Sequence, residues 1–356
     1  MKKALLFEPY LDVMGGGERH VLSIMEVLQE NGYAVDIAWD DEKILGDLRT
    51  QLHMPLKDFH IVPNVFKPGL GKQRDALTRQ YDIFIYVTDG SYFLSNAKKN
   101  YIFAMYPDKT LFKLTPLNWL KTRRYQVIAN GDFTAERIKS WLKIKTHVLP
   151  PYFDKNQFES SSKRSKTIIS VGRIFQHLHS KRHDIVIQAF IRLKEKYQEC
   201  NDFSLDIIGG LKKEDTEYMK SLQKLAEGRK DISFHTNISH KDLKKHYSTA
   251  LFYWHAGGFG IEENLHPENV EHFGITPIEA MISGCITLCY NAGGPKKYIT
   301  DGNNGYLYNT IEELVDKTYS AYTHPQKDII KNAQEYIDSH FSPEVFKNTA
   351  KIIFDL

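Results

Sequence analysis

Two glutamates lie eight positions apart in the stretch ENVEHFGITPIEAM, residues 268–281: Glu271 and Glu279. Glu279 follows Thr276 by three residues with Pro277 between them, which is the pattern of a capping box with proline at the first helical position. Glu271 precedes that helix, so it is either a surface carboxylate or a group with chemistry to perform. Carboxylates accept hydrogen bonds from neutral hydroxyls, and two of them beside a helix start would suit a ligand with hydroxyls at both ends.

The start of this helix also favours an anion. If Thr276 caps the helix, the amides of Gly274 and Ile275 lie at its amino end, where the dipole and unpaired N–H groups attract negative charge. Hydroxyls, then phosphate, then hydroxyls describe a nucleotide sugar. We therefore predict that Glu271 contacts the transferred sugar, that Glu279 contacts the ribose, and that the substrate-binding stretch includes Phe273, Gly274 and Ile275.

Two cations and a glycine run could hold the diphosphate. Arg173 ends a predicted strand and Lys181 precedes the next predicted helix, so they could bind as a fork and as a point charge. Gly16 and Gly17 follow the first predicted strand and open a helix, where backbone without side chains allows a phosphate to approach. Considered one at a time, each cation could equally be a solvated surface residue, and each glycine could be present only to form a turn.

Alternating strands and helices must position these residues. Apolar runs at 2–8, 33–39, 81–87, 100–106 and 125–130 read as strands, with helical periodicity at 18–31 and 133–142. Such alternation predicts a parallel sheet with helices on both faces. The fold class is therefore α/β.

A proline and serine-rich polar stretch, residues 149–166, interrupts this alternation before it restarts at SKTIISVGR. We expect an N-terminal Rossmann-like domain at 1–155 and a C-terminal one at 156–335, facing each other across a cleft. The tail is predicted as two helices broken at Ser342-Pro343, and residues 336–356 are expected to return to the N-terminal domain.

Composition fits a globular protein of two domains. The chain has 356 residues, of which 42% are hydrophobic and 26% are charged. Its three cysteines lack metal-ligand spacing, which argues against a disulfide framework or a structural zinc. The start MKKALLFEPYL carries too short an apolar run for a signal peptide or a spanning helix, so a cytoplasmic location is expected.

Positive charge is concentrated between residues 98 and 145, with eleven Lys and Arg against three acids. Within it, residues 111–124 (LFKLTPLNWLKTRR) interleave Leu114, Leu117, Trp119 and Leu120 with basic residues. This segment could rest on the inner face of an anionic membrane, or it could form a buried connection bordered by basic residues. Nucleic acid is not expected as a partner, because no nucleic-acid motif accompanies the charge.

The order of motifs along the chain resembles a known family. The sequence contains in turn GGGERH, VIANGDFTAERI, VGRIF, HSKRHD, WHAGGFG, EHFGITPIEAMISGCI, NAGG and DGNNGYLY. Together these are similar to the retaining family 4 glycosyltransferases of GT-B fold, and the EHFGI variant is similar to the branch that includes lipid-linked-oligosaccharide mannosyltransferases.

The resemblance implies two doubly wound Rossmann-like domains and roles for particular residues. Glu271 and Glu279 would contact donor sugar and ribose, Arg173 and Lys181 would bind the diphosphate, and the glycine loop would close from the other domain. Glu271, Arg173 and Lys181 are thus the expected catalytic group. The chain departs from the family pattern at Met105, where many relatives carry a histidine.

We therefore expect a retaining, metal-independent hexosyltransferase without a cofactor, which moves a sugar from a nucleoside diphosphate to a glycan or lipid-linked acceptor. Two alternatives from other classes stay open: a GT-B sugar-nucleotide epimerase and a noncatalytic nucleotide-sugar binding protein. His255, in YWHAGG, is interpreted as a packed strand-end histidine rather than a donor ligand.

Overall fold

The chain folds into two compact units in a computed structural model, which describes residues 1–113, 115–161, 163–177, 180–324 and 328–356. Unit 1 comprises Met1–Tyr152 and Pro343–Leu356, and unit 2 comprises Phe153–Ser342. Leu114 and the histidine at 179, which belong to segments singled out above, lie outside the described residues.

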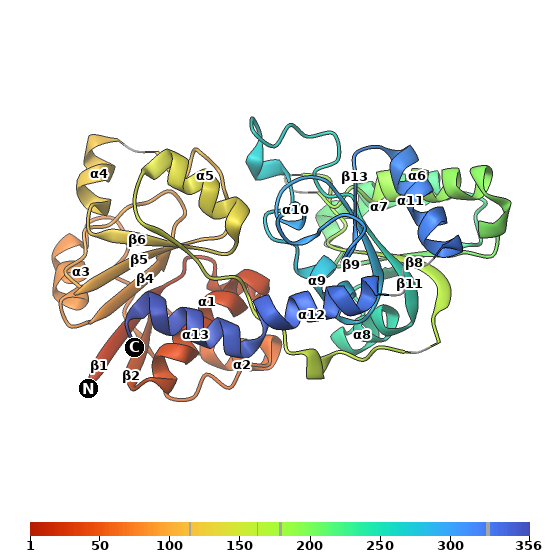
Figure 1. Ribbon diagram of the computed structural model, residues 1–356. Coiled ribbons are helices and arrows are strands. Elements are labelled where there is room, and N and C mark those ends of the chain that lie inside the picture. The colour runs from red at the N-terminus through yellow and green to blue at the C-terminus, as the bar shows by residue number, and fades with distance from the viewer. Residues whose placement is uncertain (114, 162, 178–179, 325–327) are drawn as a thin grey trace. The chain divides into compact units, whose positions relative to one another are not determined.

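Unit 1 is built on a parallel sheet of seven strands among the described residues, in the order β3-β2-β1-β4-β5-β6-β7. Figure 1 labels β1, β2, β4, β5 and β6 of this sheet. The strands are β1 (Lys2–Phe7), β2 (Tyr33–Ala38), β3 (Phe59–Val62), β4 (Ile83–Val87), β5 (Lys99–Ala104), β6 (Tyr125–Ala129) and β7 (Thr146–Val148). The helices are η1 (Leu11–Val13), α1 (Gly16–Glu30), α2 (Ile44–Leu52), α3 (Gly71–Thr78), α4 (Pro116–Thr122), α5 (Asp132–Leu142) and α13 (Pro343–Phe354).

The strands of unit 1 contribute side chains to two hydrophobic cores, one on each face of the sheet. In β1, Ala4 and Leu6 pack with α1, α2 and α13 on one face, whereas Leu5 and Phe7 pack with α3 and α5 on the other. Successive side chains point to opposite faces of a strand, so a strand buried on both faces must be apolar throughout. The predicted parallel sheet with helices on both faces is confirmed for this unit.

Unit 2 repeats the architecture with a parallel sheet of six described strands in the order β10-β9-β8-β11-β12-β13. The strands are β8 (Ser165–Val171), β9 (Ser204–Gly209), β10 (Ile232–Thr236), β11 (Ala250–His255), β12 (Ile286–Tyr290) and β13 (Tyr306–Tyr308). The α-helices are α6 (His183–Lys196), α7 (Thr216–Leu225), α8 (His240–Thr249), α9 (Ile275–Ile282), α10 (Pro295–Tyr298), α11 (Ile311–Thr323) and α12 (Ile329–Phe341). Short 3-10 helices lie at η2 (Lys155–Gln157), η3 (Gln198–Cys200), η4 (Lys213–Asp215) and η5 (Pro267–Asn269).

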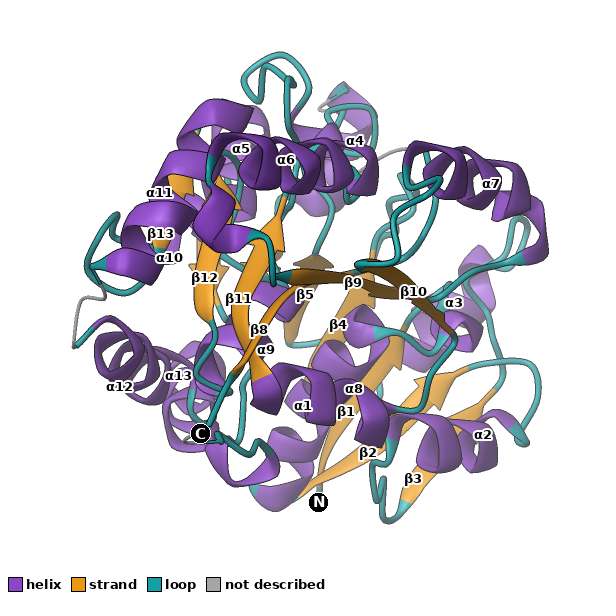
Figure 2. Cartoon of the chain, turned by 90° about the vertical axis from the view of Figure 1, so that its right-hand side faces the viewer, coloured by secondary structure: helices purple, strands orange, loops and turns teal. Residues whose placement is uncertain are grey.

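The sheet of unit 2 is also covered on both faces. Figure 2 shows α6 and α7 on one face and α8 on the other. Ile168 of β8 packs with α6, α7 and α11, while its neighbour Ile169 packs with Tyr247 of α8 and Ala280 of α9. This arrangement leaves the carboxyl ends of β8 and β11, which are paired neighbours, at one edge of the sheet.

The unit boundaries differ by a few residues from those expected at 155 and 335. Phe153 already packs in the core of unit 2, where its amide donates to the carbonyl of Phe341 at 2.7 Å. The helix α12 belongs to the same core through Ala333 and Ile337. The second boundary therefore falls at the predicted break, Ser342-Pro343, because the proline starts a new helix after an extended residue.

Candidate functional site

A buried ion pair lies at the carboxyl ends of β8 and β11. Lys181 follows β8, and its ammonium contacts the Oε2 atom of Glu271, which lies between η5 and α9. His255, the last residue of β11, places its Nε2 atom 3.0 Å from the same oxygen. The side chains of Lys181 and Glu271 are 14% and 11% exposed, and that of His255 is 1% exposed. The structure thus brings together two of the three expected catalytic residues.

The charges of this cluster are set by burial and by the pairing. Burial raises the pKa of the Glu271 carboxyl, but the Lys181 ammonium and the hydrogen bond from His255 lower it by more than burial raises it. The resulting pKa lies well below the usual value of a glutamate. Burial lowers the pKa of His255, and its contact with Glu271 offsets only part of that effect. The cluster therefore holds an ionised carboxylate, a cation and a neutral imidazole that donates from Nε2.

Two glycines make room for these side chains. A Cβ atom on Gly172 would lie 2.4 Å from Cγ of Lys181, and one on Gly257 would lie 2.6 Å from Cε1 of His255. Both distances are too short for any larger residue without displacement of the neighbour. The glycines of VGR and HAGG thus position the lysine and the histidine.

The NAGG loop fixes the backbone of Glu271. The amide of Gly294 donates to the carbonyl oxygen of Glu271 at 2.7 Å, and a Cβ atom on Gly293 would lie 2.0 Å from that oxygen. The loop and residues 271–273 can pack this closely only because both positions lack side chains. This contact holds the carboxylate from its backbone side.

The capping-box interpretation of Thr276 and Glu279 is wrong. The helix α9 begins at Ile275, and its N-cap is Gly274 at a φ of 94° with no side-chain cap. Glycine tolerates this left-handed conformation, so the helix can begin one residue before Thr276. Thr276 instead shares a hydrogen bond of 2.8 Å with the hydroxyl of Tyr253.

Glu279 lies on the first turns of α9 and accepts a hydrogen bond of 3.1 Å from the hydroxyl of Tyr247. The ring of Phe273 is buried in a cluster with Tyr298 and Phe341, so this residue contributes packing beside the helix start. The amide of Ile275 stands at the first position of the helix, as the anion hypothesis requires.

Arg173 lies in the segment between β8 and α6 that also carries Lys181, whereas the glycine loop belongs to unit 1. Arg173 is exposed just beyond β8 and places its guanidinium 4.7 Å from the ring centre of Phe175. In unit 1, Gly16 is exposed at the first position of α1, while a Cβ atom on Gly17 would lie 2.6 Å from Sδ of Met105. Met105 therefore packs directly against the glycine loop.

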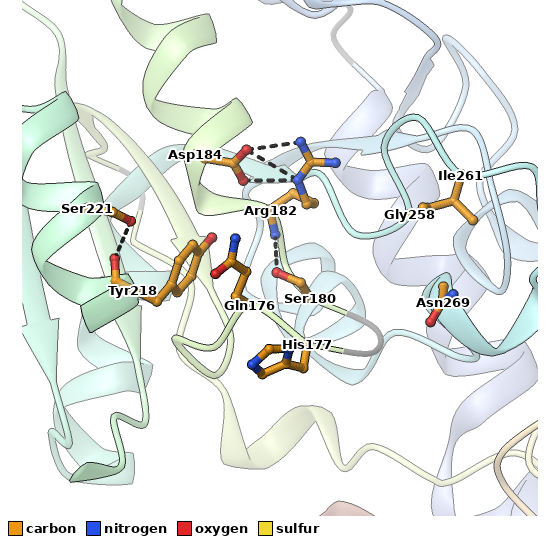
Figure 3. Close-up of a pocket in the computed structure, with 10 residues that line it drawn as sticks. All are labelled: Gln176, His177, Ser180, Arg182, Asp184, Tyr218, Ser221, Gly258, Ile261 and Asn269. Atoms are coloured by element: carbon orange, nitrogen blue, oxygen red, sulfur yellow. Dashed lines mark hydrogen bonds and ion pairs between the residues drawn. The ribbon is translucent and has the colours of Figure 1, made fainter. Parts of the chain in front are cut away.

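A polar hollow of about 550 Å³ opens between the loops that follow β8 and β11 (Figure 3). The guanidinium of Arg182 pairs with Asp184 at 3.0 Å and donates to the carbonyl of Phe259 at 2.8 Å, which balances its charge. The remaining polar groups are amides, hydroxyls and an imidazole, which suit a neutral ligand rich in hydroxyls. The lining residues are Gln176, His177, Ser180, Arg182, Asp184, Tyr218, Ser221, Gly258, Ile261 and Asn269.

His255 contacts the ion pair, although its position in the sequence predicted only a packed histidine. Its burial was expected, but its contact with Glu271 was not, because the two residues are 16 positions apart and lie on different elements. The available signal was its position at the end of β11, beside the strand that leads to Lys181.

The model of the family described as Glycosyl transferases group 1 matches residues 153–336, which is more than half of the chain. The chain belongs to this family. The matched region includes Arg173, Lys181, His255, Glu271 and Glu279, so the ion pair lies within the part that defines this glycosyltransferase family.

Curated relatives of the chain include proteins named GDP-Man:Man(3)GlcNAc(2)-PP-Dol alpha-1,2-mannosyltransferase. The protein from Mus musculus is 28% identical over 242 residues, which cover 62% of this chain and 46% of the relative. The protein from Caenorhabditis elegans is 27% identical over 263 residues, which cover 65% and 53%. The chain thus spans about half the length of these relatives.

Solved structures share the fold across nearly the whole chain. A glycosyltransferase from Rickettsia africae matches with a TM-score of 0.75 at 16% identity, covering 99% of this chain and 98% of that one. HepE from Anabaena, in complex with UDP and glucose, matches with a TM-score of 0.70 at 17% identity, covering 99% and 100%. Together with the two parallel sheets, these likenesses confirm the predicted GT-B fold of two Rossmann-like domains.

Proposed function

We propose that this glycosyltransferase-family protein moves a sugar from a nucleoside diphosphate to a glycan or lipid-linked acceptor, with retention of anomeric configuration and without a metal ion. The observation that carries the proposal is the buried pair of Lys181 and Glu271 at the carboxyl ends of two central strands. Ligands of open parallel sheets bind at this edge. A cation and a carboxylate there provide one group for a phosphate and one for sugar hydroxyls.

Each residue has a role that follows from the charge that develops during transfer. Negative charge grows on the leaving diphosphate, and Lys181, Arg173 and the amide at the start of α9 stabilise it as an oxyanion hole does. When phosphate pairs with Lys181, the Glu271 carboxylate becomes available to the hydroxyls of the sugar. Fixed cations perform here the charge stabilisation that a metal supplies in other enzymes, and no protein base is needed if the leaving phosphate oxygen accepts the acceptor's proton.

Other groups supplement this core. Glu279, held by Tyr247, would accept hydrogen bonds from the ribose. The polar hollow beside Arg182 would receive neutral hydroxyl-bearing parts of the substrates. In the other unit, the exposed Gly16 and the adjacent Gly17 would contact the diphosphate.

The acceptor class is proposed from the relatives and from unit 1. The names of the mouse and nematode relatives specify GDP-Man and a PP-Dol-linked oligosaccharide. In unit 1, the residues Leu117, Trp119 and Leu120 on α4 are 60%, 54% and 42% exposed, beside exposed basic residues. We propose that α4 rests on a membrane surface that carries the acceptor. Among the described residues, no helix is long and apolar enough to span a bilayer.

Nucleotide binding provides the first experiment. Thermal unfolding with UDP, GDP and ADP, each with and without its attached sugar, should show stabilisation by one base, because a ligand at one hundred times its dissociation constant adds about 2.7 kcal/mol. Arg173→Ala should abolish that stabilisation. Donor turnover with lipid-linked and free glycan acceptors, and nuclear magnetic resonance of the product's anomeric carbon, then test transfer and retention.

Several results would overturn the proposal. Full loss of transfer on removal of metal ions from protein that stays folded would contradict metal independence, and an inverted product would contradict retention. Release of an epimerised nucleotide sugar without acceptor would indicate an epimerase. Saturable nucleotide binding without transfer or donor hydrolysis would indicate a binding protein.

A further inference from the structure

Two histidines and an aspartate meet on one face of the sheet in unit 2. Asp206 lies on β9, His235 on the neighbouring edge strand β10, and His246 on α8, which covers that face. The register pairs Asp206 with Ser233, so the side chains of Asp206 and His235 point to the same face. None of these residues belongs to the cluster around Glu271, which lies at the ends of β8 and β11.

Ligand atoms of the three side chains lie close enough together to approach one metal ion. His235 Nε2 lies 3.3 Å from one oxygen of Asp206, and His246 Nδ1 lies 3.2 Å from the other. Tetrahedral Zn²⁺ with bonds of about 2.0–2.1 Å places neighbouring ligand atoms about 3.3–3.4 Å apart. One ligand atom from each residue lies within 4.8 Å of the others, so a small rotation of the rings would complete the arrangement.

One nitrogen of this cluster lacks a hydrogen bond. His235 Nε2 is buried and makes none with any described residue, although a carboxylate oxygen is near. An unsatisfied buried polar atom is costly, and a bound cation would satisfy it. The cluster is also accessible, because the side chains of His235, His246 and Asp206 are 32%, 26% and 17% exposed, which leaves space for a water as fourth ligand.

We propose that Asp206, His235 and His246 form a binding site for a divalent transition metal, with Zn²⁺ as the preferred ion. Imidazole nitrogen with carboxylate oxygen is a ligand set that suits Zn²⁺, and three protein ligands leave a position for water. Binding replaces the contact between His246 Nδ1 and Asp206 by two bonds to the metal, and any proton on that nitrogen is released to solvent. The ion would fasten the edge strand β10 and the helix α8 to β9, so it should stabilise unit 2.

The test uses full-length protein without a histidine tag. After removal of metals by chelator and dialysis, Zn²⁺ titrated by calorimetry should bind at one ion per chain and raise the unfolding temperature, with reversal by EDTA. His235→Ala and His246→Ala should each weaken binding on the order of tenfold to a hundredfold or more. The matched control is His266→Ala, because His266 is also paired with a carboxylate, that of Glu268, in the same unit; this variant should bind as the wild type does.

Cobalt substitution gives a readout that does not depend on any variant's folding. Co²⁺ should produce the intense visible bands of a four-coordinate ion with nitrogen and oxygen ligands, and Zn²⁺ should displace it. A thiolate charge-transfer band would place the ion at a cysteine and overturn the proposal, as would the absence of saturable Zn²⁺ binding. Zn²⁺ affinity that is unchanged in folded His235→Ala and His246→Ala would overturn it too.

Discussion

Lys181 and Glu271 stand 90 residues apart in the chain and form an ion pair from which solvent is largely excluded. Desolvation penalises each charge, so the pair is held by mutual attraction and by the hydrogen bond from His255. A charged ligand that enters here finds a lysine and a carboxylate already positioned. The free protein therefore keeps its two principal polar groups in a low-dielectric environment before any substrate binds.

Replacement of Glu271 by Gln should lower sugar transfer on the order of a hundredfold or more, because a group that positions the donor in the transition state is lost. Binding of the free nucleoside diphosphate, which lacks the sugar, should be retained. Steady-state turnover and nucleotide titration by calorimetry measure the two effects. Both measurements should be made well below the unfolding temperature of the variant, because the loss of the charged partner of Lys181 should destabilise the protein.

Asp231→Asn is the matched control for that variant. Asp231 is also paired with a lysine, Lys194, but it precedes β10 and so lies at the amino ends of the strands. Its replacement should leave transfer unchanged. Wild-type transfer by well-folded Glu271→Gln protein would refute the role assigned to the first glutamate.

Replacement of Glu279 by Gln should weaken nucleoside diphosphate binding by about 1.5–3 kcal/mol, the range for hydrogen bonds to a charged group. The unfolding temperature should change little, because Glu279 completes no capping box in this structure. Calorimetric titration and thermal unfolding of the same sample separate the two quantities.

Tyr247→Phe tests how Glu279 is oriented, since this change removes only the hydroxyl that donates to the carboxylate. It should weaken nucleotide binding by less than Glu279→Gln does. Equal affinity of wild type and Glu279→Gln for the nucleotide would exclude contact with the ribose.

Glu8 should make the protein less stable as the pH rises. This residue follows β1 and is fully buried, and burial raises the pKa of its carboxyl from 4.5 to about 8, although the amide of Tyr10 donates to it. Between these pH values the folded chain holds a proton that the unfolded chain has lost, so the free energy of unfolding decreases as pH rises from about 4.5 to 8. The total effect is on the order of a few kcal/mol.

Glu8→Gln mimics the protonated form and should flatten the dependence of unfolding temperature on pH between about pH 5 and pH 9. Glu42→Gln, which changes an exposed carboxylate of the same unit, should keep the wild-type slope. A slope that is identical in Glu8→Gln and wild type would show that Glu8 is ionised throughout this range.

Vesicle flotation should detect membrane binding through α4 and the basic residues beside its exposed apolar side chains. Wild-type protein should float with anionic vesicles and not with neutral ones, because Lys121, Arg123 and Arg124 lie beside exposed apolar side chains. Replacement of these three residues by Ser should abolish flotation.

Replacement of Lys212, Lys213 and Lys220 by Ser removes the same charge from an exposed surface of unit 2 and serves as the control. It should leave flotation intact. Equal flotation with anionic and neutral vesicles would argue against an electrostatic membrane contact.

The sequence by itself determined the two parallel sheets and the segments that border the site. Apolar runs such as residues 83–87 are buried on both faces of the sheet. Because successive side chains of a strand point to opposite faces, an uninterrupted apolar run is enough to indicate this burial. The short edge strands β3 and β7 are only partly buried, so their weaker pattern did not single them out. The sequence likewise placed Lys181 and Glu271 just ahead of predicted helices without the structure.

Only the tertiary structure decided which polar side chains meet. His255 contacts Glu271, and Asp206 contacts His246 across 40 residues, because strand order and register bring distant elements together. The start of α9 was also decided in three dimensions, since Gly274 adopts a left-handed conformation while Thr276 bonds to Tyr253. Local periodicity encodes which face of an element is apolar, whereas the partners of a polar group depend on the packing of the whole sheet.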